Sequence, residues 1–292
     1  MAAFHAREID YCEEQSAADA RAYEHIPGVR VETVTTPFVQ QLTLNVADPI
    51  FADPAVRRAI AHALDRPSMV RAVVGSDAYV ARSIVGPVHW SYSADVPSYA
   101  YEPERAERLQ PAASRRRGAD GVRVRGTQRL AFVNHAWREW ERSYATLIVQ
   151  YLRRIGVEMT VRVAPDFASI EAVRRTGTAQ SLYFGSFDYE PSELYQYFHG
   201  SQSPPAGVNL GHYGNPVVDD LLVRAQVTTG LADRKALYAE VQSRILDDCA
   251  TIPLHVHMVS CVIGPRLGGY PPPKGNWQAV IHDRPWLLTT TS

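Results

Sequence analysis

The most regular pattern of apolar and polar positions lies in residues 53–64, where apolar side chains recur at the three- and four-residue spacing of a helix. Asp53 can cap the first free amides, and Pro54 suits the first helical position. The apolar stripe consists of Val56, Ala59, Ile60, Ala63 and Leu64, and the opposite side carries Arg57, Arg58, His62 and Asp65. We therefore predict a helix with one buried side, followed at Arg66 and Pro67 by a second helix.

Residues 129–185 alternate between strand and helix patterns. Residues 129–134 and 181–185 are typical of strands, and apolar and polar residues alternate along 157–163 as in a half-buried strand. A helical stripe closed by Gly156 precedes that strand, and a short helix over 169–175 follows it. This succession predicts an α/β fold with right-handed connections, in a region that spans residues 41–257.

The segments on either side of this region have weaker patterns. Residues 1–40 predict a short helical piece and then an alternating strand. Within the α/β region, two later helices are predicted, one starting at Asn215 and one with apolar positions every four residues over 237–245. Residues 259–286 are rich in proline and glycine, which predicts irregular structure.

Composition limits the possible classes of function. At 292 residues with 46% hydrophobic content, the chain can bury the core of one large domain or two ordinary ones. Its 30 basic and 31 acidic residues give a formal net charge of −1, which provides no overall field for nucleic acid or an anionic membrane. We therefore expect no nucleic-acid partner and interpret the basic run at residues 115–117 as a solvated loop.

Cysteine usage and hydropathy add two further expectations. Cys12, Cys249 and Cys261 are odd in number and far apart, which predicts neither a zinc site nor a dense disulfide framework, although one pair can form. The sequence has no apolar run approaching the ~20 residues of a membrane span. Residues 1–10 lack the apolar core of a signal peptide, so the sequence as written is expected to carry no export signal.

No sequence motif indicates catalysis. The sequence has no nucleophile elbow, glycine-rich phosphate loop or metal-binding helix motif, so we expect neither an enzyme nor a cofactor. His255 and His257 lie on one face of a predicted strand and could hold a metal, but the spacing identifies no third ligand, and packing is the favoured interpretation. The acidic pairs at residues 219–220 and 247–248 point apart on helices, and we expect them to be solvated.

A strand ending at Leu44 and Asn45 is followed by residues 51–66, FADPAVRRAIAHALDR, and this stretch resembles the central signature of the family 5 extracellular solute-binding proteins. These are the dipeptide, oligopeptide and nickel receptors of ABC importers. The segments NPVVDDLL, DRKALYAEVQSRILDD and IPLHVHM also occur in the order and spacing of that family's closing part. The resemblance covers nearly all of this chain, but only the later half or so of a family member.

The resemblance implies an α/β fold of the periplasmic-binding-protein-like type II. Residues 41–257 would form one essentially complete ligand-binding lobe, residues 1–40 a remnant of the first lobe, and residues 258–292 a return to that mostly missing lobe. In such receptors two lobes close over a solute about a hinge, which here is expected near residues 38–45 and 257–264. The closed form then docks on a permease.

The function implied by the resemblance involves no covalent chemistry. We expect an extracytoplasmic, monomeric component of an ABC importer that binds a di- or oligopeptide, or another small solute, and delivers it to the permease and ATPase subunits. Because the contacts of the other lobe and its exclusion of water would be lost, we expect the chain alone to bind peptide weakly or not at all.

The resemblance also indicates an acidic ligand residue. In the importers, an acidic residue after the strand at 181–185 pairs with the ammonium end of a bound peptide, which points here to Asp188 or Glu190. The alternative interpretation of these acids is an ordinary surface loop. Tyr189, between them, could form an apolar wall of the cleft or belong to the core.

A basic ligand residue is implied at the start of the helix after residue 134. An arginine there holds the ligand carboxylate in dipeptide receptors, because its planar fork of donors suits that group. Arg142 and Arg138 are the two candidates, and a solvated helix face is the alternative for both. Trp137, beside them, could line the cleft or pack in the core.

One stretch departs from the family. Where the family has a helix ending in Gly-Trp, this chain has Pro111 inside the expected helix and Ser114 and Arg115 in place of Gly-Trp. Proline removes a helix hydrogen bond at a cost of about 3 kcal/mol, so we predict an early end of the helix. Together with the missing first lobe and export signal, this departure suggests a truncated or decaying gene.

Two other functions fit part of the sequence. A nickel-chelate or opine receptor has the same fold, and histidines in the cleft would favour it. The ligand-sensing domain of a cytoplasmic regulator fits the absence of an export signal, but it requires a DNA-binding helix-turn-helix that no segment of the sequence supplies.

Overall fold

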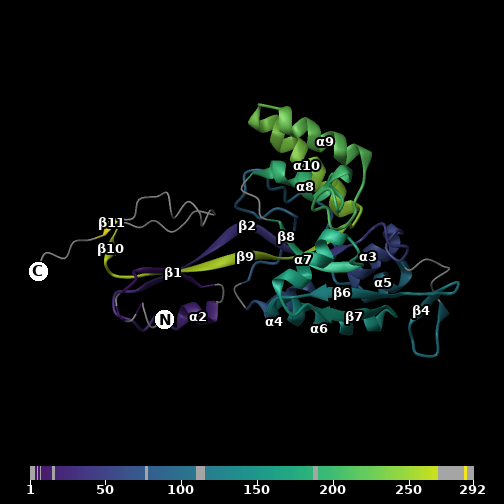
Figure 1. Cartoon of the computed structure of the whole chain (residues 1–292), viewed down its shortest axis with the longest axis horizontal. Helices are drawn as coiled ribbons and strands as arrows, with labels where there is room; N and C mark the ends of the chain where they lie inside the picture. The colour runs from purple at the N-terminus through teal and green to yellow at the C-terminus, as the bar shows by residue number, and fades with distance from the viewer. Residues whose placement is uncertain are drawn as a thin grey trace, which may run out of the picture.

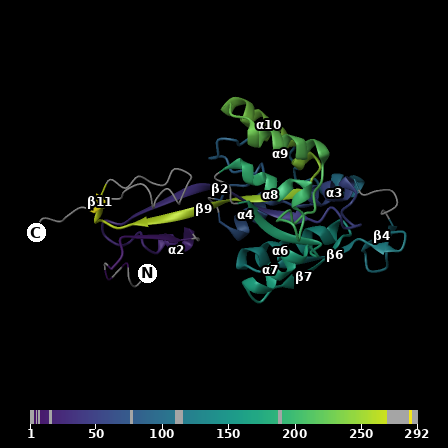
Figure 2. The ribbon, with the colours of Figure 1, turned by 45° about the horizontal axis from the view of Figure 1, so that its top comes forward.

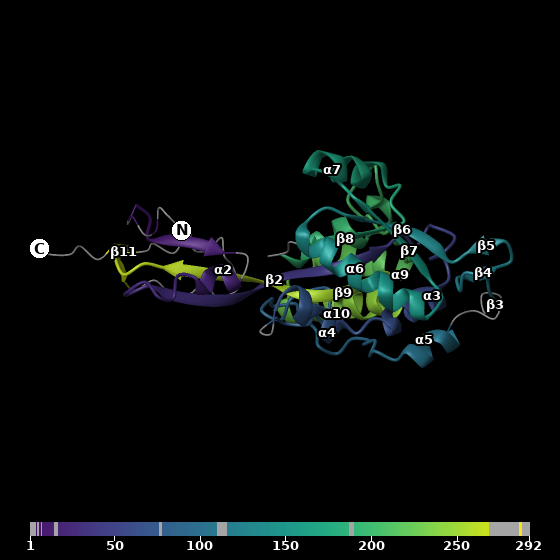
Figure 3. The same cartoon turned by 90° about the horizontal axis from the view of Figure 1, so that it is seen from below.

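The computed structural model describes residues 4, 6, 8–14, 17–75, 78–109, 116–186, 190–268 and 286–287. They form a broad α/β body and a narrow arm that projects from one side of it (Figure 1). Two long strands, β2 (Arg30–Leu44) and β9 (Thr251–Ile263), run from the body into the arm and join the two parts. Views from two other directions show the same division (Figures 2 and 3).

A six-stranded sheet crosses both parts, in the order β1-β9-β2-β8-β6-β7. Its β2 strand is antiparallel to β9 and β8, whereas β6 is parallel to β7 and β8. The other four strands are β1 (Tyr11–Glu14), β6 (Ala131–Ala136), β7 (Glu158–Val163) and β8 (Ser181–Ser186). Shorter strands form two small separate sheets: β3 (Arg116–Arg117), β4 (Arg123–Arg125) and β5 (Gln128–Arg129) in one, and β10 (Leu267–Gly268) and β11 (Trp286–Leu287) in the other.

The α-helices are α2 (Ala17–Arg21), α3 (Pro54–Ala63), α4 (Arg66–Val73), α5 (Pro103–Leu109), α6 (Glu139–Arg154), α7 (Phe167–Thr176), α8 (Leu194–Phe198), α9 (Pro216–Val227) and α10 (Leu231–Asp247). Two 3-10 turns, Pro191–Glu193 and Gly200–Gln202, flank α8. One apolar core joins α3, α4, α5 and α6 to the sheet, and a second joins α8, α9 and α10.

In the body, helices cover both faces of the sheet. Side chains alternate between the two faces along each strand, so neighbouring residues of one strand contact different helices. Tyr183 of β8 contacts the ring of Trp140 of α6, with 5.8 Å between ring centroids. Its neighbour Leu182 packs with Val173 of α7. Helices α6 and α7 therefore lie on opposite faces of β8.

The pairing of β2 with β9 is interrupted where the two strands leave the body. Thr35 pairs with Met258, but the next paired residue, Val39, lies opposite Val256, so the ladder contains a bulge. Within this bulge the Thr36 hydroxyl donates to the carbonyl of residue 257 at 2.9 Å. The interrupted residues, 36–38 in β2 and 257 in β9, lie at the first residues of the two predicted hinge segments, 38–45 and 257–264.

Gly86 lies against this break. Its amide donates to the Pro37 carbonyl at 2.9 Å, and a Cβ atom at Gly86 would lie 2.7 Å from the same oxygen. Because that distance is shorter than a van der Waals contact, the close approach requires glycine.

The predicted strand-helix-strand-helix-strand succession is confirmed as β6, α6, β7, α7 and β8. The prediction of irregular structure over residues 259–286 is wrong for its first part, because β9 continues to Ile263 and β10 covers Leu267–Gly268. Pairing with β1 and β2 supplies the backbone of residues 259–263 with hydrogen-bond partners that lie far away in the sequence.

Two further predictions concern the basic run at residues 115–117 and the helix before it. Arg116 and Arg117 form the exposed strand β3 rather than a loop, and Arg117 donates to Glu107 at 2.7 Å. The described part of α5 ends at Leu109. Residues 110–115, which include the substitutions that depart from the family pattern, lie outside the described residues.

Two further expectations concerned disulfide bonds and membrane-spanning helices. Cys12, Cys249 and Cys261 form no disulfide with one another, so the pair that the sequence allowed does not form. Among the helices in the described part of the chain, none combines the length and apolarity needed to cross a bilayer.

Candidate functional site

The candidate site is the edge of the sheet where β6, β7 and β8 end. These strands are parallel, so their carboxyl ends, at Ala136, Val163 and Ser186, meet at one edge. In open α/β sheets, ligands bind in the crevice outside the carboxyl ends of the strands. We call this edge the carboxyl edge; Trp137 and Arg138, two of the predicted ligand residues, directly follow β6 there.

Glu141 holds the backbone of this turn in place. Its carboxylate accepts hydrogen bonds from the amides of Trp137, at 2.6 Å, and Arg138, at 3.2 Å. Only 2% of Glu141 is exposed. Burial raises the pKa of Glu141, while the two amides and the nearby guanidinium groups of Arg174 and Arg138 act in the opposite direction. The first turn of α6 therefore carries a buried carboxylate among positive charges.

Arg138 is the exposed residue of the turn, and Trp137 beside it is half-buried. The Arg138 guanidinium lies 4.9 Å from the centre of the Trp137 ring, and the ring contacts that of Phe167 at 5.4 Å between centroids. Partial burial lowers the pKa of Arg138, and the charge of Glu141 opposes that shift. Since Phe167 is 53% exposed, the three side chains present a cation beside an aromatic wall at the surface.

The other predicted ligand residues have partners elsewhere. Arg142 has an exposed side chain and forms an ion pair with Glu139 of the same helix. Glu190 forms an ion pair with Arg234 of α10 at 2.5 Å. Within the described chain, neither forms a hydrogen bond or ion pair with the Arg138 side chain. The structure thus brings together Trp137 and Arg138, while the predicted Asp188 and Tyr189 lie outside the described residues.

The two predicted strand histidines pack rather than converge on a common site. His255 is 5% exposed, its Nδ1 lies 3.0 Å from the Tyr144 hydroxyl, and burial lowers its pKa to about 3. His257 stacks on Phe38 at the strand break, with 6.3 Å between ring centroids. In the ranges that the structure describes, no group of three or more His, Cys, Asp or Glu side chains is arranged to hold a metal ion.

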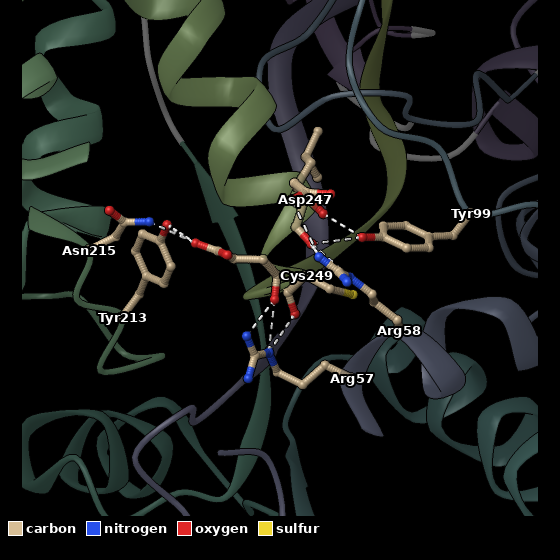
Figure 4. Close-up of polar contacts among 9 residues, drawn as sticks. Arg57, Arg58, Tyr99, Tyr213, Asn215, Asp247 and Cys249 are labelled. Atoms are coloured by element: carbon tan, nitrogen blue, oxygen red, sulfur yellow. Dashed lines mark hydrogen bonds and ion pairs between the residues drawn. The ribbon is translucent and has the colours of Figure 1, made fainter. Parts of the chain in front are cut away.

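The signature segment at residues 51–66 performs a different task, which Figure 4 shows. Arg57 donates from Nη1 to the Phe51 carbonyl at 2.6 Å, and from Nε to the carbonyls of Asp248 at 3.0 Å and Cys249 at 3.2 Å. Arg58 donates from Nη2 to the Asp247 carbonyl at 2.7 Å. The carbonyls of Asp247, Asp248 and Cys249 belong to the end of α10 and the residues that follow it, where a helix leaves acceptors unpaired and carries partial negative charge.

Further donors from other segments reach the end of α10 (Figure 4). The hydroxyl of Tyr99 donates to the Leu246 carbonyl at 2.7 Å. The Asp248 carboxylate accepts from the Tyr213 hydroxyl at 2.6 Å and from the Asn215 amide at 2.9 Å. We call the set of Arg57, Arg58, Tyr99, Tyr213 and Asn215 around the end of α10 the helix clamp.

Three predictions for residues in or near the helix clamp are wrong. Arg57 and His62 were placed opposite the buried stripe of α3, yet they are only 5% and 2% exposed. Arg57 is buried where it donates to the carbonyls of Phe51, Asp248 and Cys249, and His62 is buried with its Nδ1 2.8 Å from the Ala100 carbonyl. Asp248 was expected to be solvated, but its carboxylate is hydrogen-bonded in the clamp. The signature segment thus stabilises the lobe and is not itself the candidate site.

Sequence reasoning missed Glu141 as a residue of the candidate site. The signal present in the sequence was its position three residues after Arg138, the spacing at which a glutamate returns to the amides at the start of a helix. Because Arg138 is an unusual cap, that signal was weak.

Comparisons with known proteins agree with the fold. The family model described as bacterial extracellular solute-binding proteins, family 5 Middle, matches residues 1–205. A probable di/tripeptide-binding protein 5 of Pseudomonas aeruginosa is 26% identical over 228 residues, which cover 77% of this chain and 42% of that protein. The chain spans about half the length of the curated relatives it matches.

Solved structures match over most of this chain. The oligopeptide-binding protein AppA of Bacillus subtilis, solved with a nonapeptide, has a TM-score of 0.84 at 22% identity, covering 98% of this chain and 57% of that one. NikZ from Campylobacter jejuni, solved with Ni(L-His), has a TM-score of 0.77 at 22% identity, covering 92% and 55%. The fold is that of type II periplasmic-binding proteins, as predicted, and this chain corresponds to part of it.

Proposed function

Because the chain belongs to the bacterial extracellular solute-binding proteins of family 5, we propose that it is the peptide-binding component of an ABC importer and that it binds at the carboxyl edge. The observation that carries this proposal is the exposed cation–aromatic surface of Arg138, Trp137 and Phe167 beside the strand break. A peptide offers the matching groups: a carboxylate for the guanidinium and apolar side chains for the rings.

The strand break supports a hinge role in this proposal. Among the described residues, β2 and β9 are the long strands that connect body and arm, and their ladder is interrupted at residues 36–38 (Figure 1). A bulge between two regular stretches is where two packed units can rotate relative to one another with little loss of pairing. Closure of a second lobe over the carboxyl edge would exclude water from the Arg138 guanidinium and strengthen its bond to a carboxylate.

The place of action follows from the family. Family 5 solute-binding proteins work outside the cytoplasmic membrane and deliver solutes to ABC permeases, and we propose both for this chain. Transfer without chemical change agrees with the relatives, which are named as binding proteins.

The proposal is tested by titrating the isotopically labelled chain with trialanine and following amide and indole resonances. We expect shifts at Trp137 and Arg138 and a dissociation constant near the millimolar range, about 4 kcal/mol of binding free energy, because one lobe supplies only part of the contacts. Trialaninamide, which lacks the carboxylate, should bind more weakly.

Other outcomes would contradict the proposal. Shifts confined to other surfaces, or none at tens of millimolar peptide, would refute binding at the carboxyl edge. Micromolar affinity would refute the expectation that the other lobe is needed. A parallel titration with the nickel–histidine complex, chosen because NikZ was solved with Ni(L-His), should leave Trp137 and Arg138 unchanged.

A further inference from the structure

A hollow of about 300 Å³ lies between α7, β8 and α8, on the face of the sheet opposite α6. Its walls combine apolar and cationic side chains from segments that are distant in the sequence. The apolar part is Phe184, Tyr197, Val208 and Leu210, and the charged part is Glu171, Arg174 and Arg175. The volume is at the small end of the range for ligand sites and suits one ring or a short aliphatic group.

Arg174 is the unusual member of this set. Its Nε atom is buried and has no hydrogen-bond partner within the described ranges. The guanidinium lies 5.9 Å from the centre of the Phe184 ring, and its Nη1 is 3.5 Å from the Glu171 carboxylate. A buried donor without an acceptor costs free energy, and an acceptor in the hollow reaches this Nε only when the Arg174 side chain turns toward the hollow.

The charge of the hollow selects the sign of that acceptor. Arg174 and Arg175 contribute two positive charges against one negative charge from Glu171, so the lining is net cationic. Because Glu171 approaches Nη1, the edge of the guanidinium that carries Nε is left for a second partner. A carboxylate fits this edge, since its two oxygens match two parallel N–H donors of an arginine.

From this geometry we propose that the hollow between α7 and α8 is a second binding site, for a small carboxylate with an apolar body. The carboxylate accepts from the Nε edge of Arg174, and the apolar body lies against Phe184, Val208 and Leu210. The hollow is lined from α7, β8 and α8 rather than from the turn after β6, although Arg174 lies close enough to Glu141 and Arg138 for their charges to interact.

The test uses phenylacetate as the probe and the Arg174 Nε–Hε resonance of the labelled chain as the readout. We expect this resonance and the amides of Phe184 and Val208 to shift with phenylacetate in a saturable manner. Phenylacetamide, which has the same body without the charge, should bind at least tenfold more weakly.

Two variants and a control decide the role of the arginine. Arg174→Gln should weaken phenylacetate binding at least tenfold, and Val208→Trp, which fills the hollow from its rim, should abolish binding while Arg174 remains. Arg224→Gln is the matched control, because Arg224 is an exposed helix arginine paired with Asp220 outside the hollow. Its binding should equal that of the unmodified chain.

The proposal is overturned if phenylacetamide binds as well as phenylacetate, if Arg174→Gln retains the affinity, or if the shifts map to another surface. Amide spectra of each variant establish that it folds. Should Arg174→Gln unfold, the Val208→Trp result and the comparison of the two probes decide the matter alone.

Discussion

Replacing Arg57 by methionine should destabilise the protein severely, although Arg57 is remote from the carboxyl edge. The methionine keeps the apolar stem but removes every donor. The carbonyls of Phe51, Asp248 and Cys249 then lose their bonds to Arg57, which are 2.6, 3.0 and 3.2 Å long. In Figure 4 the Arg57 guanidinium lies beside Cys249, to whose carbonyl it donates.

The size of the effect follows from those bonds. Each buried acceptor that loses its partner costs about 1–3 kcal/mol, so three acceptors give a loss of at least about 3 kcal/mol. Burial also lowers the pKa of Arg57, so the native state already bears a desolvation cost that the variant no longer has. We therefore expect a net loss of about 2–4 kcal/mol, a large part of the ~5–15 kcal/mol that stabilises a typical domain.

Urea unfolding followed by tryptophan fluorescence measures this loss, with two companion variants. Arg57→Lys should recover part of it, because an ammonium group can reach fewer of the carbonyls. Arg58→Met should cost less than about 1 kcal/mol, since the Arg58 side chain is 36% exposed and its partners are accessible to water. A loss below ~1 kcal/mol for Arg57→Met, or equal losses at both positions, would refute the reasoning.

Three further predictions concern the strand break, acid stability and the loop after β8. Gly86→Ala should destabilise by about 1–3 kcal/mol in urea unfolding, because its Cβ would meet the Pro37 carbonyl at 2.7 Å; an unchanged midpoint would contradict this. The pKa of His255 is lowered to about 3 in the fold, so the unfolded chain binds the extra proton as pH falls below 6.5 and stability is lost progressively down to pH 3. Replacing His255 by Asn should therefore flatten the fall of unfolding free energy with decreasing pH by up to ~1.4 kcal/mol per unit, and an identical slope would be the opposing result. Glu190→Gln should change unfolding free energy by less than about 1 kcal/mol, because its ion pair with Arg234 is solvent-exposed; a loss above 2 kcal/mol would contradict that assignment.

Local patterns were sufficient to predict much of the fold. Asp53 accepts from the amide of residue 55 at 2.8 Å as the cap of α3, and Asn215 caps α9 in the same way. These features depend on neighbours within a few residues, so the sequence displays them directly. The strand-helix-strand succession of the body follows from periodicity for the same reason.

Long-range partners explain what the sequence did not reveal. Arg57 was expected away from the core because a charged residue is normally exposed, but two of its acceptors, the carbonyls of Asp248 and Cys249, lie 191 and 192 residues later in the chain. Residues 259–263 form a strand because β1 and β2 pair with them, which no local pattern indicates. Glu190 was predicted to contact ligand, and its observed partner, Arg234, comes from a helix 44 residues further along.

The sequence indicated two residues of the candidate site, whose role in ligand binding stays a prediction, but not the contacts around them. The turn after β6 was expected to present Trp137 and Arg138, and both lie there. The supporting role of Glu141 depends on the backbone geometry of the turn, and the contact with Phe167 depends on the placement of α7. Neither can be derived from spacing alone.

The most direct test of the account compares peptide titrations of Arg138→Gln and Arg142→Gln by calorimetry and resonance shifts, using trialanine and trialaninamide. The account predicts that the unmodified chain and Arg142→Gln prefer trialanine, whereas Arg138→Gln binds both peptides equally weakly. Preference for trialanine that survives in Arg138→Gln, with shifts away from Trp137, would contradict binding at the carboxyl edge.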